Sequence, residues 1–170
     1  MEESLFVKET NNRIYIRVQG HMTANACPEL KARVFDRLEA KPAVEDVYVD
    51  MSSCEYMDST FMGLLVGFNK RFLRFSPHPI HLSGVNETCM KLLKTIGVAR
   101  LLLIDDEAPR FPEPLERLGS GRKAGAALVL KAHEELIELS EENERKFSAL
   151  RSTLKDAVSR EEGNAQESAT

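Results

Sequence analysis

Apolar positions near the start of the chain follow two different periods. Residues 5–7 and 13–18 are rich in β-branched and aromatic side chains, and a turn-forming triplet at residues 10–12 separates them. This pattern predicts a β-hairpin whose second strand ends at Gly20. After Gly20, apolar residues recur at intervals of three and four. That spacing is typical of an amphipathic helix, and Thr23 is placed to cap its first turn.

The middle of the chain alternates short apolar runs with helical patterns. The predicted order is a buried strand at residues 44–51, a polar loop at 52–55, a helix from Asp58 to about residue 75, a strand at 80–82, a helix at 87–95 closed by Gly97, and a last strand at 98–104. Strands that alternate with helices require crossover connections and parallel pairing, whereas a hairpin is antiparallel. The sequence therefore predicts an α/β fold with a mixed β-sheet, an N-terminal hairpin and helices packed against the sheet.

The last third of the chain has a different composition. Residues 107–123 are rich in proline, glycine and charge, which predicts a linker after a compact domain at residues 1–106. Residues 124–160 carry an apolar stripe opposite a charged face, which predicts one long C-terminal helix, and residues 161–170 are predicted to be a disordered tail. The stripe spans about three heptads and is interrupted by Asn143. Two arrangements stay open: pairing of two copies in a coiled coil, and packing of the helix on its own domain.

Composition narrows the class of protein. With 170 residues, of which 42% are hydrophobic, the chain can bury one core of ordinary domain size. No apolar run reaches the roughly 20 residues that cross a bilayer, and the acidic start lacks the features of a secretory signal. We therefore expect a cytoplasmic protein without membrane contact. The net charge of −4 comes with no concentrated basic face, which argues against direct nucleic-acid binding.

Side chains that bind metals or catalyse reactions are few and scattered. The chain has three cysteines, odd in number and far apart, which predicts reduced, buried thiols: Cys27, Cys54 and Cys89. His78 and His81 flank a proline without an acidic or cysteine ligand nearby in sequence, so no metal site is predicted. No pattern of nucleophile and base emerges, and neither a cofactor nor an enzymatic activity is expected. Gly63 and Gly67 belong to no nucleotide-binding pattern and are expected to let their helix approach the sheet closely.

The most informative segment joins a buried strand, through a short polar loop, to Asp58, Ser59 and Thr60 at the start of a helix. In the first turn of a helix, a side chain lies near unpaired backbone N–H groups and the positive end of the helix dipole, where a phosphate group is tolerated. Aspartate, serine and threonine are also preferred as plain N-caps. Ser59 is therefore a candidate phosphorylation site and, alternatively, part of a structural cap.

This segment and its surroundings resemble the STAS domain of bacterial anti-sigma-factor antagonists over residues 5–105. The resemblance rests on Asp58-Ser59-Thr60 after a strand and a loop, on Val18-Gln19-Gly20 before the first helix, and on Leu82-Ser83-Gly84 followed by Ile96-Gly97-Val98. In that family, the serine after the aspartate is phosphorylated by a partner kinase. The resemblance therefore assigns the phosphorylation role to Ser59.

Three features differ from the family pattern, and one of them is Met62, which stands where the family usually has leucine. Phe61 stands where the family has glycine, and the segment His21-Met22-Thr23 replaces an acidic residue that usually follows the family's first glycine. An outward-pointing Phe61 would add an aromatic contact beside the serine, whereas an inward-pointing one would belong to the core. By resemblance, the partner-binding surface is expected to contain Asp58, Ser59, Thr60, Phe61, His21, Met22 and Thr23.

The resemblance implies a regulatory binding module. An anti-sigma-factor antagonist would bind a kinase-type anti-sigma factor, lose that binding when the serine kinase phosphorylates Ser59, and regain it through a serine phosphatase. The alternative is an unphosphorylated STAS scaffold or adaptor whose C-terminal helix forms a homodimer or recruits a partner. In that alternative, Ser59 is only a helix cap.

Overall fold

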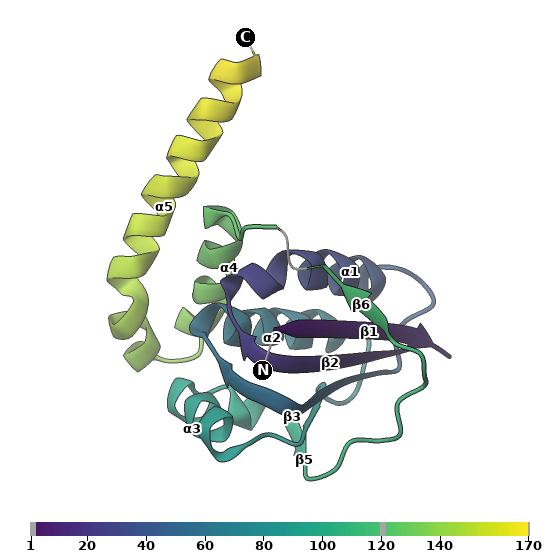
Figure 1. Cartoon of the computed structure of the whole chain (residues 1–170). Coiled ribbons are helices and arrows are strands. Elements are labelled where there is room, and N and C mark those ends of the chain that lie inside the picture. Colours follow the sequence, from purple (N-terminus) through teal and green to yellow (C-terminus); the bar gives the residue numbers. More distant parts are fainter. Residues whose placement is uncertain (1–2, 120–121, 170) are drawn as a thin grey trace.

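The computed structural model describes residues 3–119 and 122–169, so Met1, Glu2, Ser120, Gly121 and Thr170 lie outside the described residues. The described part contains a six-stranded sheet with the order β5-β4-β3-β2-β1-β6 (Figure 1). β1 pairs antiparallel with β2 and with β6, whereas β2, β3, β4 and β5 pair in parallel. The predicted mixed sheet is confirmed.

The N-terminal hairpin consists of β1 (Ser4–Thr10) and β2 (Arg13–Met22). Its two turn residues, Asn11 and Asn12, both adopt positive φ angles, of 52° and 60°, which asparagine tolerates better than most residues. β2 continues two residues beyond Gly20, where the sequence predicts its end, because its backbone still pairs with β3 there.

The parallel strands are β3 (Asp46–Met57), β4 (His81–Ser83) and β5 (Leu103–Asp105). β3 includes the serine-rich stretch that the sequence predicts as a loop, since pairing with β2 continues across two irregularities in register. β5 is shorter than predicted. The apolar residues before it form a 3₁₀ turn, η2 (Ala99–Leu101), which turns their side chains toward the core.

Three helices contribute to one hydrophobic core with the sheet: α1 (Cys27–Glu39), α2 (Ser59–Phe72) and α3 (Glu87–Ile96). A short 3₁₀ helix, η1 (Ala24–Ala26), precedes α1. Gly97 ends α3 in the left-handed conformation, with φ of 85°, as the sequence predicts. The paired ends of β2 and β3 lie next to the start of α2, because β3 ends at Met57 and α2 begins at Ser59.

The predicted linker contributes a strand to the sheet. β6 (Glu116–Leu118) pairs antiparallel with β1, which would otherwise be an unpaired edge. The chain therefore passes from β5 at one edge of the sheet to β6 at the other. On the way, Phe111 packs edge-on against Tyr15, with 5.1 Å between ring centroids, and lies 5.2 Å from the guanidinium carbon of Arg17. The segment after residue 106 is thus anchored to the sheet.

The single long helix predicted at residues 124–160 is instead two helices, α4 (Ala126–Ile137) and α5 (Glu141–Ala169), with a turn at residues 138–140. Asn143, which interrupts the apolar stripe, is buried and donates two 2.8 Å hydrogen bonds from Nδ2, to the carbonyl oxygens of Leu136 and Ile96. It therefore ties α5 to α4 and to α3. The sequence left two arrangements open for this region. α4 and the first turns of α5 pack on their own domain, whereas pairing of two copies in a coiled coil stays a prediction.

The rest of α5 projects away from the body of the molecule (Figure 1). It remains helical to Ala169, so the predicted disordered tail is helical over its described part. No helix within residues 3–119 and 122–169 has the length and apolar character needed to cross a membrane.

Candidate functional site

The candidate site forms where the C-terminal ends of two parallel strands meet. His21 pairs with Tyr56 and Met22 with Met57, and the backbone N–H of Asp58 donates to the carbonyl of Met22 over 2.9 Å. Segments about 35 residues apart in sequence, around His21 and Ser59, are therefore neighbours in space. The structure thus brings together the two stretches that the sequence analysis assigned to one surface.

Asp58 organises this junction through its carboxylate. Oδ1 accepts a 2.9 Å hydrogen bond from the backbone N–H of Phe61, which makes Asp58 the N-cap of α2. Oδ2 accepts another 2.9 Å hydrogen bond from the backbone N–H of Ala24 in η1. Thr23, expected to cap the first helix, makes no side-chain capping bond. The carboxylate of Asp58, which lies between β3 and α2, accepts a hydrogen bond at that helical start instead, and sequence proximity does not reveal this contact.

Ser59 is the first residue of α2, and its hydroxyl faces the C-terminal helices. Its Oγ lies 2.8 Å from Nε2 of His133 on α4. Nδ1 of His133 lies 2.8 Å from the carbonyl oxygen of Val129, which can only accept, so Nδ1 carries a proton. In the neutral ring Nε2 is then an acceptor, and the Ser59 hydroxyl donates to it. Phe147 of α5 packs edge-on against the same imidazole.

The Ser59–His133 pair lacks the third member of a catalytic triad. A carboxylate would be needed at Nδ1 to stabilise an imidazolium, but a backbone carbonyl occupies that position. His133 was not predicted as a site residue because its partner lies 74 positions away. The sequence did contain a signal that could have indicated His133, because this histidine lies on the apolar stripe of the C-terminal helix, beside Ala132 and Leu136. In the structure it is 2% exposed.

Close contact between α2 and α4 holds His133 over the serine. A Cβ atom on Gly63 would lie 2.1 Å from the carbonyl oxygen of Ala132, so only glycine fits at this crossing. Gly63 therefore allows close approach of α4, and not of the sheet, to α2. Gly67 faces the ring of Phe35 on α1. Lys70 of α2 contributes ion pairs to two glutamates of the α4 segment, Glu135 and Glu138.

The charge pairing at this helix contact is reflected in pKa values. Hydrogen bonds from Lys70 to Glu138 and Glu135 raise the pKa of the lysine, and the bond to Lys70 lowers the pKa of Glu138. Because the pKa of Glu138 is lowered, its favourable contribution is present at neutral pH and is lost as the pH falls through that lowered value. The pair is exposed, so its effect is small.

Burial separates the predicted contact residues into two groups. His21 is exposed, and Thr23, Asp58 and Ser59 are partly exposed. In contrast, Met22, Thr60 and Phe61 are 0%, 4% and 0% exposed. This corrects the expected partner surface: these three side chains point into the core, and Phe61 takes the inward orientation of the two alternatives. The exposed Tyr56 and the ion pair between His21 and Glu55 lie on the surface instead.

A groove with a volume of about 560 Å³ opens beside Ser59, between the start of α2, α3 and α5. Its lining combines apolar side chains with two lysines and includes Tyr56, Ser59, Lys91, Leu92, Lys146 and Phe147. The groove therefore offers both apolar surface and positive charge next to the serine hydroxyl.

All three cysteines are buried and unpaired, in accordance with the prediction of packed thiols. Cys27 lies near the site, and burial, with a smaller contribution from the negative charge of Asp58, raises the pKa of its thiol to about 12. It therefore stays protonated at neutral pH and is not a nucleophile.

The fold is a mixed-sheet α/β domain in which Ser59 begins α2 beside a groove. A family model described as "Mlab, STAS domain" matches residues 5–104. The chain therefore belongs to the STAS domain family, whose anti-sigma antagonist members are non-enzymatic regulatory binding proteins. The resemblance recognised in the sequence is confirmed.

Individual relatives carry related descriptions. The anti-sigma-B factor antagonist of Staphylococcus aureus (strain NCTC 8325 / PS 47) is 26% identical over 98 residues, which cover 57% of this chain and 88% of the relative. The structure of the anti-sigma factor antagonist SpoIIAA in its unphosphorylated form matches with a TM-score of 0.54 and 18% identity, covering 61% of this chain and 89% of SpoIIAA. A candidate anti-sigma factor antagonist from Thermotoga maritima matches with a TM-score of 0.52 and 19% identity, over 59% and 85% of the two chains. The two solved structures support the fold; α4 and α5 lie beyond the matched family region.

Proposed function

We propose that this chain is an anti-sigma factor antagonist that binds a kinase-type anti-sigma factor through the surface around Ser59 and is switched off when that serine is phosphorylated. A serine phosphatase would restore binding. The observation that carries the proposal is the position of Ser59: it follows the N-cap Asp58, begins α2, and borders the groove between α2, α3 and α5. The proposal fits the similarity to antagonists of anti-sigma factors.

The surroundings of Ser59 are suited to a phosphate group. The N-terminus of α2 supplies backbone N–H groups and the positive end of the helix dipole. Lys91 and Lys146 line the same groove, and His133 would offer a further donor when protonated. A phosphorylated Ser59 could therefore be held by the chain's own donors. Its added charge of about −1.5 to −2 would repel an acidic partner surface.

In this proposal, the helix α4 also controls the access of a kinase to Ser59. In the described conformation the Ser59 hydroxyl is engaged by His133, and the start of α5 covers part of the same region. A kinase must reach Oγ, so α4 has to move locally before transfer of phosphate. Access to Ser59 is thus coupled to the docking of α4 on α2.

The test is phosphorylation with mapping. The full chain, incubated with its cognate serine kinase and ATP, is expected to gain one phosphate that maps to Ser59 by mass spectrometry, and to lose kinase binding in proportion. Ser59→Ala should gain no phosphate and should still bind the kinase. The matched control is Ser53→Ala, which removes a hydroxyl from the adjacent β3 strand and should be phosphorylated like the native chain. Phosphate that maps elsewhere, or unchanged binding after modification, refutes the proposal.

A second function, that of an adaptor, is favoured by one observation. Beyond its first turns, α5 projects from the domain (Figure 1), and along it Leu150 is 39% exposed while Leu154, Ala157 and Val158 are partly exposed. A helix that is anchored at one end and free at the other is suited to pairing with another helix. In this alternative, α5 would recruit a partner or a second copy, and Ser59 would be only a cap.

Truncation within α5 separates the two functions. A chain ending at residue 152 keeps Asn143 and Phe147, the residues that bury the start of α5, and removes only the projecting part. The antagonist proposal expects this shortened chain to keep the oligomeric state of the full chain in sedimentation experiments, and to keep its phosphorylation and its kinase binding. The adaptor alternative expects a lower oligomeric state or loss of the partner. A cut after residue 122 is less informative because it also uncovers the face of α2 at Gly63.

A further inference from the structure

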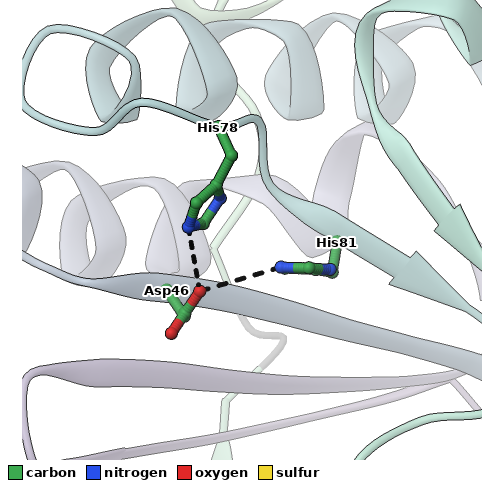
Figure 2. A group of neighbouring side chains, drawn as sticks. All are labelled: Asp46, His78 and His81. Atoms are coloured by element: carbon green, nitrogen blue, oxygen red, sulfur yellow. Dashed lines mark ion pairs between the residues drawn. The ribbon is translucent and has the colours of Figure 1, made fainter.

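Three side chains that are distant in sequence converge at the opposite end of β3 from Ser59. Asp46 begins β3, His81 begins β4, and His78 lies in the loop before β4. Oδ1 of Asp46 is 3.2 Å from Nε2 of His78 and 3.7 Å from Nε2 of His81. Figure 2 shows both imidazole rings directed at the Asp46 carboxylate from different sides. One ligand atom from each residue lies within 4.8 Å of the other two.

Each imidazole is fixed through its other nitrogen. Nδ1 of His78 is 3.0 Å from the carbonyl oxygen of Pro79, and Nδ1 of His81 is 2.9 Å from Oδ2 of Asp105 in β5. Both partners are acceptors, so both Nδ1 atoms carry protons and direct the two Nε2 atoms inward. This is the arrangement by which proteins prepare histidines as metal ligands: a carbonyl or carboxylate sets the tautomer and the orientation of the ring.

The carboxylate is oriented in the same way. Oδ2 of Asp46 accepts a 3.1 Å hydrogen bond from Nε of Arg13, its neighbour on β2, which leaves Oδ1 for the two histidines. Neutral rings with protonated Nδ1 would present two Nε2 lone pairs to a carboxylate oxygen, which is unfavourable. A positive species between these three atoms, either a proton or a metal ion, removes that repulsion.

We propose that Asp46, His78 and His81 form a binding site for a divalent transition-metal ion of the zinc class. Two imidazole nitrogens and one carboxylate oxygen suit zinc, cobalt or nickel better than magnesium or calcium, which prefer oxygen ligands. Ligands at the usual 2.0–2.1 Å from a tetrahedral zinc ion lie roughly 3.4 Å from each other. The two distances to Asp46 are close to that value, so small side-chain rotations complete the site. The sequence does not reveal this site, because Asp46 is 32 and 35 positions from the two histidines.

The metal site is separate from Ser59, and a bound ion would stabilise the fold. Asp46 and Met57 are the two ends of the 12-residue strand β3, so the metal site and Ser59 are roughly 35 Å apart along it, at about 3.3 Å per residue. A bound ion would join the start of β3 to β4 and to the loop that leads from α2. The Asp46 and His81 side chains are 17% and 20% exposed, so an ion can enter from solvent.

Zinc binding to the full chain tests the proposal. Untagged protein, freed of metal with a chelator, is titrated with zinc chloride in a calorimeter, and one equivalent is expected to bind and to raise Tm. His81→Ala and Asp46→Asn should each weaken binding by about 100-fold or more, because each removes one of three ligands. Asp105→Asn should weaken binding by about 10-fold to 100-fold through loss of ring orientation.

Two matched variants make the result specific. His21→Ala removes an exposed histidine that pairs with Glu55 elsewhere, and Asp106→Asn removes the exposed carboxylate next to Asp105. Both should bind zinc like the native chain. Circular dichroism without metal establishes that each variant is folded, and cobalt absorption reports the ligand geometry independently of stability. Binding that survives His81→Ala in a folded variant, or a native chain that binds no zinc, overturns the proposal and leaves an imidazolium–carboxylate ion pair.

Discussion

Replacing Gly63 with alanine is expected to separate α4 from α2 and to free the Ser59 hydroxyl. The added Cβ would lie 2.1, 2.6 and 2.8 Å from the carbonyl oxygen, carbonyl carbon and Cα of Ala132. These are backbone atoms of a helix, which cannot rotate away as a side chain can. Overpacking of this kind costs about 3 kcal/mol, which exceeds the roughly 1 kcal/mol gained from the higher helix propensity of alanine.

The measurement is thermal unfolding together with amide hydrogen exchange in α4. We expect Tm to fall by roughly 4–8 °C and exchange to become faster in Ala126–Ile137 than in the sheet. Gly67→Ala is the matched control on the same helix, since its Cβ would meet side-chain atoms at ordinary contact distances, 3.4 Å from the Phe35 ring and 3.9 Å from Nη1 of Arg71. Gly67→Ala should leave α4 docked. Equal behaviour of the two variants would contradict the account of the α2–α4 contact.

Substitution of Asp58 by alanine is expected to destabilise the chain by roughly 2–4 kcal/mol. The change removes the N-cap of α2 at the N–H of Phe61 and leaves the N–H of Ala24 without its acceptor. Loss of an N-cap alone is worth about 1 kcal/mol, and an unsatisfied backbone donor adds a further 1–3 kcal/mol. Urea unfolding followed by circular dichroism gives the free energy of unfolding.

Two variants separate the contributions of Asp58. Asp58→Asn retains an oxygen that can accept from the backbone N–H of Phe61, but it places an amide nitrogen, which cannot accept, against the N–H of Ala24. Its loss in free energy of unfolding should therefore be about half that of Asp58→Ala. Thr23→Ala should have little effect, because the Thr23 side chain makes no capping hydrogen bond. If Thr23→Ala were as destabilising as Asp58→Ala, the local cap predicted from the sequence would be correct and the long-range contact of Asp58 would be incidental.

Much of the fold was predictable because its signals are local. The two asparagines predicted the hairpin, Gly97 predicted the end of α3, and the Asp58-Ser59 pair predicted the start of α2. Element lengths were less predictable. The serine-rich end of β3 and the strand β6 form because neighbouring strands offer backbone partners, and side-chain patterns do not record that pairing.

The candidate site was predictable only in part. Ser59 and Asp58 were found from their position at a helix start, and family resemblance added His21 and Thr23. The sequence could not place Phe61, because an aromatic residue at the start of a helix suits either the core or the surface; its complete burial follows from the packing of α2. Nor could it explain Asn143, whose polar side chain satisfies carbonyls on two other helices.

The sequence by itself determined the alternation of strands and helices, the STAS resemblance and the place of Ser59 at the start of α2, because periodicity and capping act over a few residues. Only the tertiary structure decided that His133 contacts Ser59, that Gly63 admits α4, and that Asp46 joins His78 and His81. Each of these contacts joins residues more than 30 positions apart. Such contacts depend on how helices and strands pack and on which backbone groups remain unpaired, and the local pattern of residues does not specify either.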